Sequence, residues 1–232
     1  MQLYAVKFGE SPFKSKYVFR DASVNEPMRI PWSYYVARYR GKSILFDVGF
    51  RDPQTAEKWG IELIDVEAEV ASVVDLNSID IIFITHSHFD HIDNIDLFPD
   101  AQIIIGCDEY EYALQNASLS VRERLLQSNV LTVKEAELFL DTFQFEVVGG
   151  HTVGSSVVYF QHDGANYAIT GDECYVVENL TARRPIGIFS NTQKNEAFLK
   201  KAHGMGIIPL PFHDPGIFQR YMKISENMVQ II

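Results

Sequence analysis

The segment that most constrains this chain is THSHFDH (residues 85–91), which places three of the seven histidines and an aspartate close together. It directly follows the apolar run IDIIFI, whose composition is typical of a buried strand. Side chains two residues apart on an extended segment share a face, so His86 and His88 can bind one metal ion. Asp90 and His91 come after the chain turns and can bind a second ion nearby.

Neither pair completes the coordination shell of an ion, so further ligands are expected elsewhere in the chain. The candidates are His151, Asp172 and His213, which directly follow the apolar runs FEVVGG, YAITG and IIPLPF. Side chains at strand ends converge easily on one rim of a sheet, and the two oxygens of Asp172 could bridge two ions. The sequence therefore predicts two divalent metal ions. Zinc is the leading candidate, and iron, manganese and cobalt suit the same ligands.

The order of predicted elements indicates a layered α/β fold, because long buried strands alternate with helices that can cover them. The predicted helices are residues 53–75, 107–127 and 195–206. The predicted strands are 2–9, 32–40, 42–48, 78–85, 101–106, 143–150 and 206–213. Hairpins are predicted around Gly41, between strands 32–40 and 42–48, and around Asp163-Gly164. No linker rich in Pro, Gly or Ser divides the chain, so residues 1–232 are expected to form one domain.

Composition limits the partners of this chain. Its net charge of −11 argues against binding to nucleic acid or to an anionic membrane, since both require a basic face. No apolar run approaches the roughly 18 residues of a membrane span, and the N-terminus lacks a signal pattern. Cys107 and Cys174 form no C-x-x-C pair and are expected to be reduced thiols. We therefore expect a cytoplasmic protein that acts on a small molecule. The sequence does not fix its oligomeric state and leaves a homodimer open.

Five motifs, in order across nearly the full length, resemble those of the metallo-β-lactamase superfamily. They are FDVG (46–49), THSHFDH (85–91), GHTVGS (150–155), TGDE (170–173) and PFHD (211–214). The resemblance implies an αββα sandwich, two mixed β-sheets flanked by helices, with a two-metal site on one edge. It also implies that one ion is bound by His86, His88 and His151, the other by Asp90, His91 and His213, and that Asp172 bridges them.

The same resemblance implies a supporting role for Asp47, which would hold the histidine loop by hydrogen bonds. Thr85 and Thr170 are expected to help in the same way. The alternative for Asp47 is a simple turn residue at a strand end.

Two neighbouring ions can hold a water molecule and lower its pKa toward neutrality, so that metal-bound hydroxide attacks a carbonyl or phosphorus atom. There is no G-x-S-x-G motif to indicate a serine nucleophile. Hydrolysis is therefore the leading reaction class. Iron-based redox chemistry is the runner-up. It is disfavoured because the flavin-partnered members usually carry an acidic residue in place of His88 and an additional domain.

Within the superfamily, the chain is most similar to N-acyl homoserine lactonases. In GDECY, Tyr175 follows Asp172 by three residues, as in that group, and would hydrogen-bond the lactone carbonyl or leaving oxygen. We therefore expect Asp90 and Tyr175 to be catalytic. Trp32, Tyr34, Tyr35 and Phe89 could line an apolar channel for an acyl chain, but strand packing is the favoured role for the first three.

Two departures from the lactonase pattern keep other substrates open. Ile92-Asp93-Asn94 stands where lactonases generally have small, glycine-rich residues, and Glu173 and Cys174 replace smaller residues. Both changes are expected near the pocket, so a thioester or phosphodiester on the same metal site is an alternative. A non-catalytic metal-binding module is a second alternative, and it would have a closed coordination shell.

Overall fold

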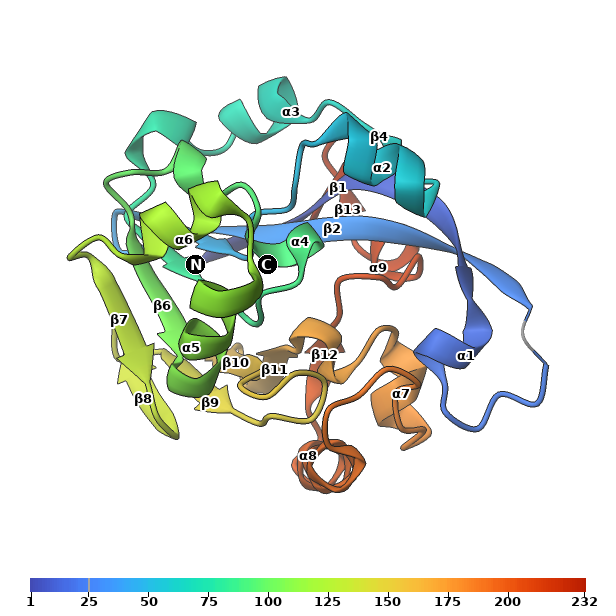
Figure 1. The fold of residues 1–232 in the computed structure, drawn as a ribbon. Helices are drawn as coiled ribbons and strands as arrows, with labels where there is room; N and C mark the ends of the chain where they lie inside the picture. The colour runs from blue at the N-terminus through green and yellow to red at the C-terminus, as the bar shows by residue number, and fades with distance from the viewer. Residues whose placement is uncertain (25) are drawn as a thin grey trace.

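The computed structural model describes residues 1–24 and 26–232, and Figure 1 shows two stacked β-sheets with helices on their outer faces. The larger sheet is formed by β13 (Met222–Lys223), β14 (Met228–Gln230), β1 (Gln2–Lys14), β2 (Pro27–Tyr39), β3 (Lys42–Phe46), β5 (Ile81–Phe83), β6 (Gln102–Gly106) and β7 (Val130–Val133), in that spatial order, with β4 (Glu62–Leu63) paired to β1. Strands β3, β5, β6 and β7 run parallel, and β1, β2 and β14 pair antiparallel. The sheet is therefore mixed.

The smaller sheet is also mixed. Its strands, in spatial order, are β12 (Ile208–Leu210), β11 (Ala165–Ile169), β10 (Ser156–His162), β9 (Phe143–Val147) and β8 (Ala136–Phe139). Strands β11 and β12 are parallel, and the other neighbours are antiparallel.

Helices cover the outer faces of the two sheets, although Ile217 of the last one packs in the core between them. The helices are α1 (Ser15–Val18), α2 (Pro53–Trp59), α3 (Glu67–Ala71), α4 (Phe89–Ile92), α5 (Cys107–Asn116), α6 (Leu119–Leu125), α7 (Val177–Thr181), α8 (Thr192–Gly204) and α9 (Ile217–Arg220), with short 3₁₀ turns η1 (Leu76–Ser78), η2 (Ile95–Leu97) and η3 (Gly171–Glu173). Buried residues of α2 to α6 pack on the larger sheet, and those of α7 and α8 pack on the smaller one. In the described part of the chain, no helix is long and apolar enough to cross a membrane.

Strand β5 explains why these strands are apolar throughout rather than alternating. Phe83 points into the core between the sheets, whereas Ile82 points into the core beneath the helices. In β10, Val158 faces the other sheet and Val157 faces α8. Both faces of each central strand are covered, so both must be apolar. The predicted αββα sandwich is confirmed.

Two predicted hairpins also form, and their turn residues explain them. Arg40 and Gly41 have φ values of 49° and 75°, and Asp163 and Gly164 have 47° and 77°. Positive φ at both central residues defines the type I′ turn, whose twist matches that of the flanking strands. The β2–β3 and β10–β11 pairs therefore keep a regular antiparallel register.

Two predicted helices are each broken. The expected helix 53–75 ends at Gly60, which adopts a left-handed conformation with φ 65°, and a short strand follows before α3. The expected helix 107–127 is interrupted at Ala117, whose backbone is extended, and α6 starts after Ser118. Apolar spacing continues across both interruptions because the separate helices pack on the same sheet face, so periodicity did not locate the breaks.

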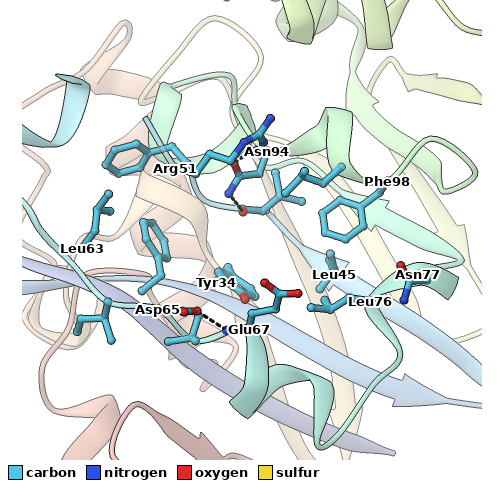
Figure 2. Close-up of a pocket in the computed structure, with 16 residues that line it drawn as sticks. Tyr34, Leu45, Arg51, Leu63, Asp65, Glu67, Leu76, Asn77, Asn94 and Phe98 are labelled. Carbon is cyan, nitrogen blue, oxygen red and sulfur yellow. Dashed lines mark hydrogen bonds between the residues drawn. The ribbon is translucent and has the colours of Figure 1, made fainter. Parts of the chain in front are cut away.

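A cavity of about 630 Å³ lies on the outer face of the larger sheet (Figure 2). Tyr34, Leu45 and Phe50 contribute to its lining, and Arg51 at the cavity is held by Asp96 at 2.7 Å. None of the seven predicted metal ligands is among its described lining residues. This cavity is therefore not the predicted metal site, although it is large.

Candidate metal centre

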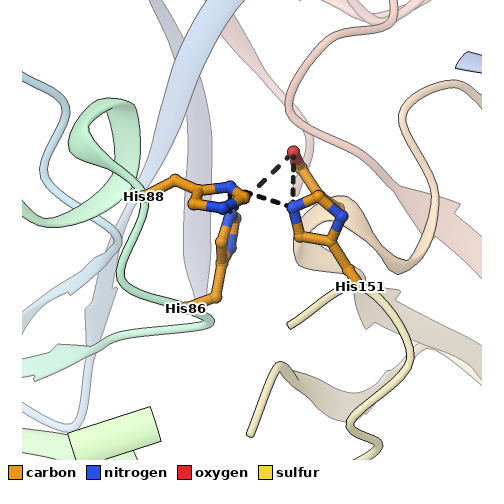
Figure 3. Close-up of side chains that lie close together, drawn as sticks. His86, His88 and His151 are labelled. Carbon is orange, nitrogen blue, oxygen red and sulfur yellow. Dashed lines mark hydrogen bonds and ion pairs between the residues drawn. The ribbon is translucent and has the colours of Figure 1, made fainter. Parts of the chain in front are cut away.

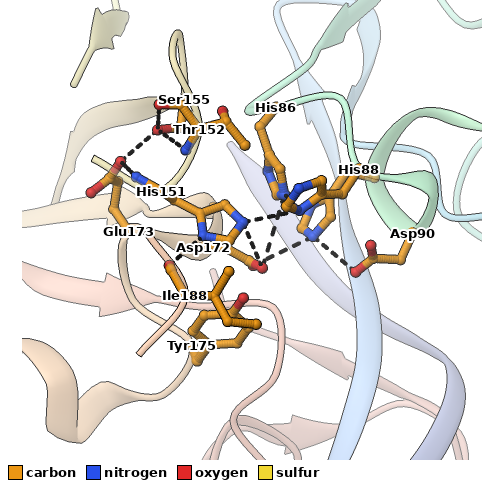
Figure 4. A network of polar contacts seen from close by, with 12 residues as sticks. His86, His88, Asp90, His151, Thr152, Ser155, Asp172, Glu173, Tyr175 and Ile188 are labelled. Atoms are coloured by element: carbon orange, nitrogen blue, oxygen red, sulfur yellow. Dashed lines mark hydrogen bonds and ion pairs between the residues drawn. The ribbon is translucent and has the colours of Figure 1, made fainter. Parts of the chain in front are cut away.

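The ends of four strands bring the seven predicted ligand residues into one cluster, of which Figure 4 labels His86, His88, Asp90, His151 and Asp172. The chain leaving β5 carries His86, His88, Asp90 and His91, and the chains leaving β9, β11 and β12 carry His151, Asp172 and His213. Strand β5 belongs to the larger sheet and the other three to the smaller sheet. The cluster therefore straddles the edge where the two sheets meet.

One group consists of His86, His88 and His151 together with Oδ2 of Asp172, and is called here the His88 position (Figure 3). Nδ1 of His88 lies 3.1 Å from Nε2 of His86 and 3.0 Å from Nε2 of His151. Oδ2 of Asp172 lies 3.6 Å from Nε2 of His151 and 3.9 Å from Nε2 of His86. Four potential ligand atoms thus converge on one point.

The second group consists of Asp90, His91 and His213 together with Oδ1 of Asp172, and is called here the His213 position. Nε2 of His91 lies 3.1 Å from Oδ2 of Asp90 and 3.4 Å from Oδ1 of Asp172. Nε2 of His213 lies 3.5 Å and 3.3 Å from the same two oxygens. The two oxygens of Asp172 therefore face different positions, as a bridging carboxylate requires.

These separations fit metal coordination. Bonds of about 2.0–2.1 Å around a tetrahedral zinc ion place its ligand atoms about 3.3 Å apart. Nε2 of His91 and Oδ1 of Asp172 are also buried without a hydrogen-bond partner among the described residues. Such orphaned polar atoms are rare in folded proteins, and a cation would satisfy both. The donor set therefore fits two divalent ions.

Asp47, at the end of β3, is fully buried and supports the cluster from behind. Its Oδ2 accepts a hydrogen bond from Nδ1 of His91 at 2.6 Å, and its oxygens also accept from the amide and hydroxyl of Thr85 at 2.7 and 2.6 Å. Its φ of 58° is a conformation that aspartate tolerates better than most residues. The hydrogen bonds expected of Asp47 and Thr85 are present. Thr170 differs, since its hydroxyl donates to the carbonyls of Gly171 and Cys174.

Hydrogen bonds to the remote ring nitrogens also fix the histidine tautomers. Nδ1 of His151 donates to the carbonyl of Ile188 at 2.9 Å, and Nδ1 of His213 donates to that of Pro31 at 3.0 Å. A carbonyl only accepts, so the proton lies on Nδ1 and the Nε2 lone pair is left for a metal.

Electrostatics differ between the two positions. Burial lowers the pKa of His86 well below its ordinary value and that of His151 to about 4. Burial also acts to lower the pKa of His91, but the carboxylates of Asp90 and Asp172 raise it well above its ordinary value. His86 and His151 of the His88 position are therefore held neutral, the form that binds metal, whereas the carboxylates of the His213 position attract positive charge.

Tyr175 lies over the cluster. Its ring centroid is 5.7 Å from that of His151 and 5.4 Å from that of His213 (Figure 4 shows its place beside Asp172). Burial raises the pKa of its phenol well above the ordinary value, as does the nearby Asp172 carboxylate. Tyr175 therefore stays protonated at neutral pH and can act as a hydrogen-bond donor.

A cavity of about 230 Å³ opens onto these groups. It is lined by Phe13, Trp32, Trp59, His88, Phe89, Asp90, Asp172, Tyr175, Ile188 and His213. Phe13, Trp59 and Ile188 were not expected from the sequence, because they come from β1, α2 and a loop with no motif of their own. Most of the lining is apolar, and the polar atoms gather at the metal positions.

Phe89 lines this cavity, and so does Trp32, for which strand packing was the favoured expectation. Tyr35 is instead buried between the sheets, where its hydroxyl donates to the carbonyl of Pro211 at 2.8 Å. Tyr34 lines the cavity of Figure 2. For these two residues, strand packing decides the direction of the side chain.

The two departures from the lactonase pattern were expected near the pocket, but neither contributes to its described lining. Ile92 is fully buried in the core beneath the helices, and the side-chain amide of Asn94 donates to the carbonyl of Val48 at 3.1 Å. The carboxylate of Glu173 points into the loop that carries His151. These substitutions therefore do not reshape the cavity directly.

The fold and the cluster together define a class of protein, the αββα sandwiches with a two-metal site at the sheet edge. The sequence model of the metallo-beta-lactamase superfamily matches residues 28–213, and the chain belongs to this superfamily. Comparison with curated proteins found no match.

Solved structures share the fold over nearly the whole chain. An N-acyl homoserine lactone hydrolase, with the product N-hexanoyl-L-homoserine at its catalytic metal centre, has a TM-score of 0.82 at 17% identity, covering 97% of this chain and 98% of that one. AidC, a dizinc quorum-quenching lactonase, has a TM-score of 0.70 at 15% identity, covering 99% and 93%. A probable metal-dependent hydrolase from Staphylococcus aureus has a TM-score of 0.75 at 13% identity, covering 91% and 88%. At such identities the likeness establishes the fold.

Proposed function

We propose that this protein is a two-metal hydrolase that opens lactones or related esters, with N-acyl homoserine lactones as the leading candidates. One observation carries the proposal: a single cavity is lined both by apolar side chains and by four polar residues of the candidate site, Asp90, Asp172, His213 and Tyr175. Such a wall suits an ester with a polar reacting end and an apolar body. The structural likeness to a hydrolase that holds N-hexanoyl-L-homoserine at its metal centre supports the same substrate class.

The proposed ligands divide between the two positions. They are His86, His88 and His151 at one position, Asp90, His91 and His213 at the other, and Asp172 between them. Bound there, two divalent ions would acidify a water molecule and polarise the substrate carbonyl. Zinc is proposed because histidine nitrogen and carboxylate oxygen suit it.

The protein's own groups would then handle orientation and protons. The phenol of Tyr175 would donate a hydrogen bond to the carbonyl or leaving oxygen and stabilise the charge that develops there. Asp90, which lines the cavity, would accept a proton at its carboxylate and return it to the leaving alkoxide. The aromatic wall formed by Trp32, Trp59 and Phe89 would hold the apolar part of the substrate.

The chemistry of the cavity favours a neutral ester over a phosphodiester. No lysine or arginine is among its described lining residues, and two of them are aspartates, Asp90 and Asp172. The two bound ions would offset the charge of both aspartates, but beyond the metal positions an anionic substrate would find no lysine or arginine among the described lining residues. A thioester remains compatible with the apolar wall, so it is the second substrate class to be tested.

The cavity also predicts chain-length selectivity. Its volume of about 230 Å³ lies below the range of about 300–1,000 Å³ that is common for ligand pockets. A lactone ring with a short substituent would lie inside it, whereas a long acyl chain would extend past Trp59, whose surface is 42% exposed.

We further propose that the protein acts in the cytoplasm on a diffusible small molecule. Cys107 and Cys174 are free thiols, which suits a reducing compartment. A homodimer is left open.

The test is proton release from zinc-loaded protein with N-butanoyl, N-hexanoyl and N-decanoyl homoserine lactones, a thioester and a phosphodiester. We expect turnover of the lactones, fastest for the shorter chains. Tyr175→Phe should lower kcat about 10²-fold, because one donor to the developing oxyanion is lost, while both zinc ions remain bound. His88→Ala should abolish activity and lower the zinc content below two ions per chain, because one position loses a ligand.

His162→Ala is the matched control, because His162 lies in the β10–β11 hairpin, with its Nε2 3.5 Å from Oδ2 of Asp163. This variant should match the wild type in zinc content and turnover. Zinc-loaded protein that turned over none of the lactones would reject the proposed substrate. Tight binding of two ions without turnover of any compound would favour a non-catalytic metal module.

A further inference from the structure

Two buried glutamates outside the proposed ligand set converge on the loop 150–155, which carries His151. Glu109 lies in the first turn of α5, and Glu173 directly follows Asp172 in η3. Both side chains are 0% exposed. A buried carboxylate is costly unless its oxygens are satisfied, so the partners of these two acids are informative.

Glu109 joins the two loops of the His88 position. Its Oε1 accepts hydrogen bonds from the amide and hydroxyl of Ser87, at 2.8 and 2.5 Å. Its Oε2 accepts from the hydroxyl of Thr152 at 2.6 Å and the amide of Gly154 at 3.0 Å. Ser87 stands between His86 and His88, so one carboxylate connects the segment with those two rings to the loop of His151.

Glu173 holds the same loop from the other side (Figure 4). Its Oε1 accepts from the amides of Gly150 and His151, at 2.9 and 2.8 Å, and from the hydroxyl of Ser155 at 2.6 Å. Its Oε2 accepts from the side-chain amide of Asn195 at 2.8 Å. The backbone of His151 itself is therefore a direct partner of this acid.

The loop approaches both acids so closely that only glycine fits at two positions. A Cβ added to Gly150 would lie 2.4 Å from Oε2 of Glu173, and one added to Gly154 would lie 2.3 Å from the backbone nitrogen of Glu109. The donors to both carboxylates are neutral groups, so neither acid is explained as half of an ion pair. Their shared effect is to fix the place of the His151 loop.

We propose that Glu109 and Glu173 are positioning residues that place the His151 imidazole and thereby shape the His88 position, without touching the ion or the substrate. The proposal rests on the metal ligands of the proposed function and is independent of the substrate. Residues that orient metal ligands typically change metal affinity about 10- to 100-fold when they are altered.

The test is zinc binding to metal-free protein, measured by competition with a chromophoric chelator, together with thermal unfolding to confirm that each variant is folded. Glu173→Ala should lower the affinity for one of the two zinc ions about 10- to 100-fold. The affinity for the other ion should be unchanged, because Asp90, His91 and His213 are untouched. Glu173→Gln should recover much of the affinity, because its carbonyl oxygen can keep the three bonds made by Oε1.

Glu109→Gln should also lower the affinity for one ion. The amide nitrogen of glutamine cannot accept a hydrogen bond, and it would face either the Ser87 donors or the amide of Gly154. If Glu173→Ala does not fold, Glu109→Gln and Glu173→Gln decide the question. Glu111→Gln, at an exposed site on the same helix, is the matched control and should bind both ions as the wild type does.

Cobalt provides a second readout, since its visible absorption reports ligand geometry. Glu109→Gln and Glu173→Ala should change the spectrum of one bound Co²⁺ ion. Folded variants that bind both ions with wild-type affinity and spectra would overturn this proposal, even if their Tm fell. A wild type that bound fewer than two ions would overturn both this proposal and the ligand set beneath it, so the two failures are distinguishable.

Discussion

The His88 and His213 positions share Asp172 but are supported in different ways. At the His213 position, Asp47 contacts the ring of His91 directly at 2.6 Å, and Asp90 adds a second carboxylate. At the His88 position the carboxylates lie one layer further out, where Glu109 and Glu173 hold the backbone rather than the rings. One position is thus organised by charge on its ligands and the other by the shape of a loop.

This difference indicates that the two ions should respond to different changes. The His213 position gathers negative charge, so altering a carboxylate there should act on the ion directly. At the His88 position the neutral rings of His86 and His151 carry no charge to draw in an ion, so its affinity should depend on how accurately the loop is held. Changes at three sites separate these two kinds of dependence.

The largest effect is expected from Asp172→Asn, which would affect the His88 and His213 positions together. One carboxylate oxygen faces each position, so both ions lose a charged ligand. We expect kcat/KM to fall by at least about 10²-fold and zinc content to drop below two per chain, measured by turnover and elemental analysis. Asp163→Asn, in the β10–β11 turn, should change neither quantity. Retention of both ions by Asp172→Asn would contradict the bridging role.

A smaller effect, greater at the His213 position, is expected from Asp47→Asn, because Asp47 contacts the ring of His91 directly and reaches His86 only through the Thr85 hydroxyl, 3.1 Å from Nδ1 of His86. The change weakens the hydrogen bond to Nδ1 of His91, so the ion at the His213 position should bind about 10- to 100-fold more weakly, as chelator competition would measure. Asp141→Asn is the matched control, because Asp141 is exposed and has a similar φ of 54°. Equal weakening of both ions would mean that the positions are not supported separately.

The smallest effect is expected from Gly154→Ala, which tests the loop alone. The added Cβ would collide with Glu109, at 2.3 Å from its backbone nitrogen, and push the loop 150–155 away from α5. We expect unfolding in urea to show a loss of about 1–3 kcal/mol and one zinc ion to bind several-fold more weakly. Gly204→Ala, at the end of α8, meets nothing within 4 Å, so it should leave zinc affinity unchanged and should not lower stability. A destabilised Gly154→Ala protein with both affinities intact would break the link between loop shape and metal binding.

The sequence could predict the contacts that local pattern carries. His86, His88, Asp90 and His91 lie within a few residues of one strand end, so their proximity follows from the strand itself. His151, Asp172 and His213 required the further step that strand ends meet at a common rim, and the order of the superfamily motifs supported it. The layered α/β arrangement followed from buried strands that alternate with helices, whereas the αββα sandwich was implied by the superfamily motifs.

The remaining features depend on packing between distant segments. Glu109 has the pattern of an ordinary acid in the first turn of a helix, where the helix dipole favours it. Its role appears only when α5 packs against the loop 150–155, 45 residues away in the case of Gly154. Glu173 was expected near the pocket because of its place beside Asp172, but the 3₁₀ turn directs its carboxylate elsewhere. The break at Gly60 was missed because apolar spacing continues beyond it.

The placement of the cluster across both sheets has a mechanical consequence. Each proposed ion would bind ligands that follow β5 of the larger sheet and ligands that follow β9, β11 or β12 of the smaller sheet. Each ion would therefore cross-link the two sheets at the edge where they meet. Anything that binds only the folded state stabilises it, so the metal supply would determine how stable the contact between the two sheets is. A cell short of metal would then hold this protein in a looser form, with its strand ends open to proteases.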